Sequence, residues 1–295
     1  MASAQPQCSI VGQGAIGLLA ASRLQQAGWA VELWLRQAAP LTVDFQPLQG
    51  ETQSLNFNAC LQPAKLLLIP VKAYAALPCL QQLQPLLQPG TQIVISHNGM
   101  PDLATLQHHV TASQGLWFLS TSQAALRTAT AVRHTGAGSS VLAALNDTAL
   151  SSQPKVEPWL NTALGPLTIT ADIQPALWRK LAINAAINPL TAIHGINNGA
   201  LAAAEFQAQL EAIVSEVCVV AAAEGMHLPL AETLQQVQQV IAATAANYSS
   251  MLQDVRVGRR TELAAITGYI VNTAARHGLA VPANQALWQA LASTA

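Results

Sequence analysis

Charged and aromatic residues are scarce in this sequence. Of its 295 residues, only 9% are charged and 4% aromatic, whereas 51% are hydrophobic, so glutamine and asparagine supply much of the polar surface. The net charge is −1 and no basic run occurs, so we expect no binding of nucleic acid or of an anionic membrane. The hydrophobic content is sufficient for a large core, and the length favours two domains.

Cysteine is also scarce, and its positions exclude several kinds of site. Cys8, Cys60, Cys79 and Cys218 have neither disulfide-framework nor metal-ligand spacing, which favours a reducing, cytoplasmic location. No Cys/His cluster, nucleophile elbow, Walker loop or internal repeat occurs, so no metal is expected. The first residues, MASAQPQ, have no basic region of the signal-peptide kind. Polar residues interrupt the hydrophobic runs before they reach the length of a membrane span.

A glycine-rich turn lies between the first strand and the first helix that the sequence predicts. Residues 8–11 are typical of a strand, and GQGAIG follows at 12–17. Residues 18–27 are typical of a helix, and residues 30–35 of a second strand. In a dinucleotide-binding fingerprint, such glycines allow a tight turn, close approach of the diphosphate and close helix packing. The helix N-terminus also offers N–H groups to phosphates. We therefore predict cofactor contacts here, and a purely structural turn is the alternative.

The residue that follows the second predicted strand indicates which cofactor binds. Arg36 occupies the place where NAD enzymes usually have an acidic residue for the ribose 2′-hydroxyl. A guanidinium can pair with a 2′-phosphate and stack on adenine, so we predict NADPH. A solvated arginine is the alternative, and Glu32 within the strand leaves NAD possible.

Two more polar residues stand at the ends of predicted strands. Residues 65–71 and 92–96 are apolar and typical of buried strands, and Lys72 and Asn98 come directly or shortly after them. Ligands of open α/β sheets bind beyond the carboxyl ends of strands, so both are candidate contacts. A surface lysine and an ordinary Asn-Gly turn are the alternatives. Further strands are predicted at 116–121, 131–135 and 167–170, and helices at 74–87, 141–150 and 154–164.

The longest predicted helix carries a polar line through an apolar background. Within residues 172–194, Lys180, Asn184 and Asn188 are four positions apart and stack along one face. Burying a lysine and two amides without partners is costly, and a bound polar ligand would supply those partners. The alternative is a face exposed to water. We expect Pro189 to kink or end this helix.

Strand patterns disappear after this point, and only helices are predicted. They cover residues 201–224, 231–246, 248–256 and 261–277. The expected fold is an α/β Rossmann-type dinucleotide-binding domain at 1–170 and an all-α domain at 171–295, with Lys180 facing a cleft between them. Glu262 is expected to begin a late helix, and an exposed acid that complements the helix dipole is the alternative.

These motifs together resemble those of the ketopantoate reductase (2-dehydropantoate 2-reductase) family. The resemblance covers nearly the whole chain and rests on GQGAIG at 12–17, Arg36, Lys72, HNGM at 97–100, LWRKLAINAAINPLTAI at 177–193, the NNG that follows, and SSMLQDVRVGRRTE at 249–262. It implies reduction of 2-dehydropantoate by NADPH for pantothenate and coenzyme A biosynthesis, and a helical domain like the C-terminal domain of 6-phosphogluconate dehydrogenase. Pro101, in place of a glycine, and the shorter segment 121–130 depart from the family.

The resemblance also implies roles for single residues. Lys180 resembles the general acid, and Glu262 its partner, which holds the substrate hydroxyl. The implied substrate ligands are Asn184, Asn188, Asn198 and Ser250. The implied cofactor set is Gly12, Gln13, Gly14, Ala15, Ile16, Gly17, Arg36, Lys72, Asn98 and Ala124.

The implied partner is a small 2-oxo acid, taken up by a monomer or homodimer that binds neither nucleic acid nor membrane. A reductase of another small 2-oxo acid is the alternative among enzymes. A catalytically silent NADP-binding sensor is the alternative from another class. Retention of both Lys180 and Glu262 argues against a sensor, which needs neither.

Overall fold

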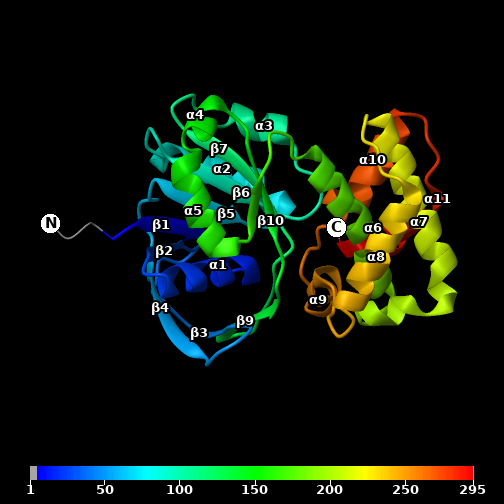
Figure 1. The fold of residues 1–295 in the computed structure, drawn as a ribbon, viewed down its shortest axis with the longest axis horizontal. Helices are drawn as coiled ribbons and strands as arrows, with labels where there is room; N and C mark the ends of the chain where they lie inside the picture. Colours follow the sequence, from blue (N-terminus) through cyan, green and yellow to red (C-terminus); the bar gives the residue numbers. More distant parts are fainter. Residues whose placement is uncertain (1–4, 295) are drawn as a thin grey trace. The chain divides into compact units, whose positions relative to one another are not determined.

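The computed structural model describes residues 5–294, and these form two compact units. The first contains the chain up to His97 and Asp102–Ile173, and the second contains the chain from Gln174 onward together with the short segment Asn98–Pro101. The first unit is built on a β-sheet and the second on helices (Figure 1). The predicted fold class, an α/β domain followed by an all-α domain, is confirmed.

The sheet of the first unit has a parallel centre. Among the described residues its strand order is β11-β10-β7-β6-β5-β1-β2-β4-β3-β9-β8, and the pairs from β7 to β4 are all parallel. Such a centre is typical of nucleotide-binding folds. The strands are β1 Gln7–Val11, β2 Ala30–Trp34, β3 Leu41–Gln46, β4 Gln53–Ala59, β5 Leu66–Pro70, β6 Gln92–Ser96, β7 Gly115–Thr121, β8 Ala124–Arg127, β9 Ala131–Gly136, β10 Ser140–Ala144 and β11 Leu167–Ile169.

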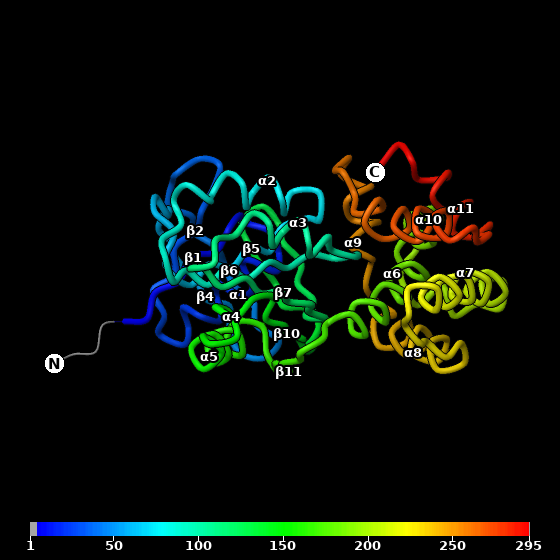
Figure 2. The backbone as a smooth tube through the Cα atoms, turned by 90° about the horizontal axis from the view of Figure 1, so that it is seen from above, coloured from blue at the N-terminus to red at the C-terminus, as the bar shows by residue number. Residues whose placement is uncertain are grey.

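Helices cover both faces of this sheet. Figure 2 shows α2 and α3 on one side of β5 to β7 and α4 and α5 on the other. The leucines of α1 pack with Trp159 of α5 and Phe45 of β3 in one buried cluster, which fixes α1 against the strands. The helices are α1 Ala15–Gln26, α2 Ala73–Leu83, α3 Leu103–His108, α4 Asp147–Ser151 and α5 Gln153–Leu164.

The second unit is organised around α6. This helix, Gln174–His194, packs against α7, α8, α9 and α11. The other helices are α7 Ala204–Ala223, α8 Leu230–Ala243, α9 Ser250–Arg256, α10 Thr267–Arg276 and α11 Pro282–Leu291. Short 3-10 turns occupy Asn198–Ala202 and Leu263–Ala265.

Helix α7 differs from the expectation that no hydrophobic run reaches the length of a membrane span. By length and composition alone, Ala204–Ala223 could cross a membrane. One such helix is a weak indication, because a buried core helix passes the same test. The helix packs against α6, α8, α10 and α11, so part of its apolar surface is buried within the unit.

The helix predicted at residues 141–150 is wrong. Ser140–Ala144 forms β10, which pairs antiparallel with the fully buried strand β7. A helix follows only at Asp147, where the Asn146 side chain accepts the Ala149 N–H (2.9 Å) as an N-cap. Apolar periodicity cannot separate a short buried strand from a helix, and the pairing with β7 decides here.

Pro189 does not end the central helix. Helix α6 continues to His194, with Pro189 buried. A proline removes one backbone donor from a helix. Packing of α6 against four neighbouring helices outweighs the local cost of the proline.

Candidate functional site

The glycine-rich turn joins β1 to α1. Gly12 has a φ of +79°, a left-handed conformation that favours glycine, and its N–H donates to the Trp34 carbonyl at the end of β2 (2.8 Å). Gly14 precedes α1, and no side chain caps this helix N-terminus. A Cβ at Gly17 would lie 3.1 Å from Pro70 Cγ. Glycine at 17 therefore lets α1 pack closely on β5, while the start of α1 presents N–H groups and the positive end of its dipole.

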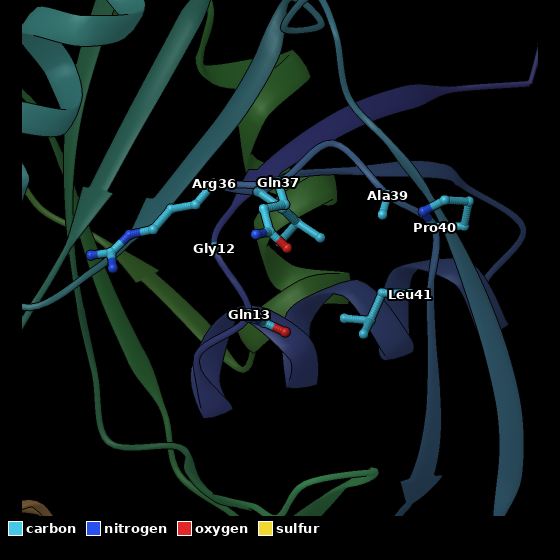
Figure 3. Close-up of a pocket in the computed structure, with 8 residues that line it drawn as sticks. Gly12, Gln13, Arg36, Gln37, Ala39, Pro40 and Leu41 are labelled. Carbon is cyan, nitrogen blue, oxygen red and sulfur yellow. The ribbon is translucent and has the colours of Figure 1, made fainter.

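A pocket of about 560 Å³ lies beside this turn (Figure 3). Gly12 and Gln13 line it together with residues between the end of β2 and the start of β3, namely Leu35, Arg36, Gln37, Ala39, Pro40 and Leu41. Arg36 is exposed, and in Figure 3 its side chain extends away from Pro40 and Leu41. The lining residues include one cation and no carboxylate, a composition that suits a phosphate group.

Other predicted cofactor residues of the first unit lie elsewhere. Glu32 does not line the pocket, and its carboxylate accepts from Gln7 Nε2 (3.4 Å). Lys72 lies two residues after the end of β5 and is the N-cap residue of α2, so it stands at the carboxyl end of this strand. Ala124 is the first residue of strand β8, within the segment 121–130. Within that segment, Ala124–Arg127 forms strand β8, which pairs with β9 and has a shift of register between Ala124 and Ala125.

The polar line of α6 is partly buried. Lys180 and Asn184 are half-buried, and Asn188 is 7% exposed. Burial lowers the pKa of Lys180 to about 8, and the Glu262 carboxylate opposes this shift. The alternative of a polar face exposed to water is therefore wrong for Asn188. A lysine with this pKa is a stronger acid near neutral pH than a free lysine.

Glu262 is buried, so the alternative of an exposed helix-terminal acid is wrong. Its exposed fraction is 5%, and it precedes the 3-10 turn Leu263–Ala265 instead of beginning a helix. The N–H groups of Ala265 and Ile266 both donate to the Glu262 carbonyl (3.0 and 3.1 Å), and α10 starts only at Thr267. This tight turn directs the carboxylate inward.

The segment Asn98–Pro101 holds the Glu262 carboxylate. Asn98 N–H donates to Glu262 Oε1 (3.2 Å), and Asn98 Nδ2 donates to Oε2 (3.0 Å). Met100 N–H donates to the Ala265 carbonyl (2.9 Å), and a Cβ at Gly99 would collide with Ala265. Gly99 has a φ of +78°. Asn98 and Gly99 therefore form a turn, as the alternative reading of this dipeptide expected, and Asn98 also binds both carboxylate oxygens of Glu262.

Asn198 and Ser250 belong to one loop system. Asn198 Nδ2 donates to Thr244 Oγ1 (2.9 Å), and its backbone N–H donates to the Asn247 carbonyl (2.9 Å). Ser250 is exposed at the start of α9, directly after the buried N-cap Ser249. The Thr191 hydroxyl of α6 donates to Ser249 Oγ (2.7 Å). Asn198 and Thr191 thus fix the two sides of the loop that carries Ser250.

Sequence reasoning missed four polar residues of these sites. Thr191, Ser249 and Thr244 support the Ser250 loop, and Arg127 Nη2 donates to Gln13 Oε1 in the glycine-rich turn (2.9 Å). The first two lie inside motifs that were recognised, which was an available signal. The hydrogen bond of Arg127 joins residues 114 positions apart, and no local sequence pattern predicts it. Between residues 5 and 294, no group of three or more His, Cys, Asp or Glu could hold a metal ion.

Comparison with known proteins identifies the family. Residues 8–147 match the model "Ketopantoate reductase PanE/ApbA", and residues 172–295 match "Ketopantoate reductase PanE/ApbA C terminal". The 2-dehydropantoate 2-reductase of Vibrio cholerae serotype O1 is 43% identical, over 95% of each chain. The chain belongs to the ketopantoate reductase family. It is accordingly an oxidoreductase.

Solved structures agree with this family. A PanE/ApbA family ketopantoate reductase from Ralstonia eutropha JMP134 has 25% identity and a TM-score of 0.85, over 98% of each chain. A ternary complex of D-mandelate dehydrogenase with NADH and anilino(oxo)acetate has 22% identity and a TM-score of 0.87, over 98% of this chain and 97% of that one. The second likeness is one of fold alone.

Proposed function

We propose that this ketopantoate reductase family member reduces 2-dehydropantoate to pantoate with NADPH, the step that supplies pantoate for pantothenate and coenzyme A. Relatives named 2-dehydropantoate 2-reductase support the substrate. The observation that carries the proposal is the half-buried Lys180, whose pKa is lowered, in the same unit as the fixed carboxylate of Glu262. Reduction of a ketone needs such an acid.

The residues of the first unit fit the dinucleotide. A Cβ built at Gly12 meets nothing within 4 Å, so the turn leaves room for a diphosphate against the backbone. Residues 12–17 would bind the diphosphate, and Arg36 would pair with the 2′-phosphate. Lys72 and Ala124 complete the proposed set of the first unit, and Asn98 of the second unit is a further proposed contact. When bound, NADPH supplies the hydride that reduces the substrate carbonyl.

Lys180 would act on the carbonyl oxygen. Addition of hydride to the carbonyl carbon places negative charge on that oxygen, and a nearby ammonium stabilises the charge. The Lys180 ammonium then donates its proton to the oxygen, which gives the hydroxyl of the product. The neutral amine regains a proton from water. Since its pKa is about 8, Lys180 is mainly charged at neutral pH and still donates readily.

The neighbouring polar residues would hold the substrate. Glu262 would accept a hydrogen bond from the substrate hydroxyl, with its two oxygens kept in place by Asn98. Uncharged donors suit the substrate carboxylate, because they bind it without opposing the charge of the lysine. The proposed donors are Asn184, Asn188, Asn198 and Ser250.

The test is the fall in NADPH absorbance on addition of 2-dehydropantoate, compared between wild type and Lys180→Ala. We expect kcat to fall by about 10²- to 10⁴-fold in the variant, while Lys155→Ala, which removes an exposed lysine of α5, changes nothing. Equal turnover in Lys180→Ala would contradict the role of the lysine.

The same assay separates the two alternative functions. Faster turnover of a 2-oxo acid that lacks the terminal hydroxyl would assign a different substrate. NADPH binding without turnover of any small 2-oxo acid would favour a sensor. The half-buried Lys180 and the buried Glu262 favour catalysis over sensing, because removing two ionisable groups from water is costly and a sensor gains nothing from it.

We further propose that the enzyme works in the cytoplasm, as a monomer or homodimer, on a small 2-oxo acid. All four cysteines are free thiols, which agrees with a reducing compartment. Light scattering after size-exclusion chromatography would decide between one subunit and two.

A further inference from the structure

Arg127 lies beside the glycine-rich turn although the two are remote in sequence. Its Nη2 donates to Gln13 Oε1 at 2.9 Å across 114 positions. Gln13 is the second residue of the turn, is exposed, and lines the pocket that also contains Arg36. A guanidinium is therefore held at the turn itself, in a chain with only 13 lysines and arginines.

The register of the β8–β9 hairpin explains why Arg127 points towards α1. Arg127 stands directly opposite Val132, and directly opposed residues share one face of a sheet. Val132 is fully buried in the cluster that contains the leucines of α1. Arg133, the next residue of β9, is exposed, because alternate residues face opposite sides.

The chemistry of this position suits a diphosphate. Strands β8 and β9 both contact α1, and the Arg127 guanidinium reaches Gln13, two residues before the first residue of this helix. The uncapped start of α1 attracts anions, and a guanidinium adds a full positive charge with donors arranged for phosphate oxygens.

We infer that Arg127 is a further cofactor-binding residue, which contacts the diphosphate of the dinucleotide while Gln13 positions its guanidinium. The inference rests on the proposed binding of NADPH by the first unit. It divides the anionic groups of the cofactor between two arginines: Arg36 takes the 2′-phosphate, which only NADPH carries, and Arg127 takes the diphosphate, which NADPH and NADH share.

Calorimetric titration of NADPH and NADH into the apo-protein tests this division. The variant is Arg127→Met, which retains the length and apolar packing of the side chain and removes its charge. Because a charged hydrogen bond is lost, we expect the affinities for NADPH and NADH to fall by the same factor, about 10- to 100-fold. Arg127→Lys should recover part of the loss in both. Arg133→Ala, the matched control on the opposite face, should leave both affinities unchanged.

Three results would overturn the inference. Unchanged affinities in Arg127→Met would show that the guanidinium does not bind the cofactor. A loss confined to NADPH would assign Arg127 to the 2′-phosphate instead. A loss accompanied by an altered circular dichroism spectrum in both Arg127→Met and Arg127→Lys would mark a structural role. Failure of the wild type to bind either cofactor would contradict the proposed function instead, so the two failures are distinguishable.

Discussion

The two units build their sites in different ways. In the α/β unit, the proposed cofactor site consists mainly of consecutive residues of one turn, which offers backbone N–H groups and has no side chains at Gly12, Gly14 and Gly17. In the helical unit, the site is made of side chains from remote positions, and Asn98 reaches Glu262 across 164 residues. The first site depends on local conformation, and the second depends on tertiary packing.

This difference predicts different responses to substitution. A change in the turn should affect cofactor affinity and leave the helical unit intact. A change in the helical unit should affect substrate turnover and leave cofactor affinity intact. Four substitutions test this separation, beginning with the largest expected effect.

Gly14→Val should abolish cofactor binding without unfolding the protein. A Cβ at Gly14 would meet only the Pro70 carbonyl oxygen, at 3.9 Å, so the folded chain has room for it. The added methyl groups would occupy the space that a diphosphate needs, and we expect a loss of NADPH affinity of at least about 100-fold. Calorimetric titration measures the affinity, and thermal unfolding supplies the control. A variant that binds NADPH normally would remove the diphosphate assignment of the turn.

Arg36→Ala should abolish the preference for NADPH over NADH. We expect NADPH affinity to fall by about 10- to 100-fold and NADH affinity to change little, because only NADPH carries the 2′-phosphate. Competitive titration with both cofactors gives the ratio. Equal losses for the two cofactors would contradict the 2′-phosphate contact and restore NAD as a candidate.

Asn98→Ala distinguishes two roles of Asn98, contact with the cofactor and positioning of the Glu262 carboxylate. The change removes the side-chain bond to Glu262 Oε2 and leaves the backbone bond to Oε1. We expect kcat/KM for 2-dehydropantoate to fall by about tenfold as the carboxylate loses its fixed orientation. If Asn98 acts only through Glu262, NADPH affinity should stay within about twofold of the wild type. A large loss of NADPH affinity at unchanged kcat would show instead that Asn98 acts only as the proposed cofactor contact.

Thr191→Val should have the smallest effect, and it should act through stability. The substitution removes the bond to the buried Ser249 Oγ and leaves the N-cap of α9 with one partner fewer. We expect the free energy of unfolding to fall by about 1 kcal/mol, with recovery in Thr191→Ser. Urea denaturation followed by circular dichroism measures it. A stability equal to that of the wild type would show that this bond contributes nothing.

The comparison also explains what the sequence could reveal. The strand, turn and helix around residues 7–26 are local, so the pattern GQGAIG predicted them, and the parallel strands β5 and β6 followed from unbroken apolar runs. The polar line on α6 was visible from helical spacing alone. Assignment of roles to its members needed the resemblance to a family, because spacing does not distinguish an acid from a structural lysine.

Features that depend on distant contacts were not predictable in the same way. Strand β10 was mistaken for a helix because its partner β7 lies outside any local window. Glu262 was placed in a helix because nothing in RRTELAAI reveals the turn that Met100 and Gly99 stabilise from another part of the chain. The bond between Arg127 and Gln13 was not predictable for the same reason, since it depends on the pairing of β8 with β9.

The pH dependence of kcat/KM for 2-dehydropantoate and NADPH tests the proposed role of Lys180 most directly. Lys180 must be protonated to donate its proton, so kcat/KM should be constant below a pH of about 8 and fall above it. The Glu262 carboxylate raises the pKa of this lysine, so in Glu262→Gln the fall should begin at lower pH. A profile that stays level through pH 8, or a break that moves upward in Glu262→Gln, would contradict the assignment of Lys180 as the acid.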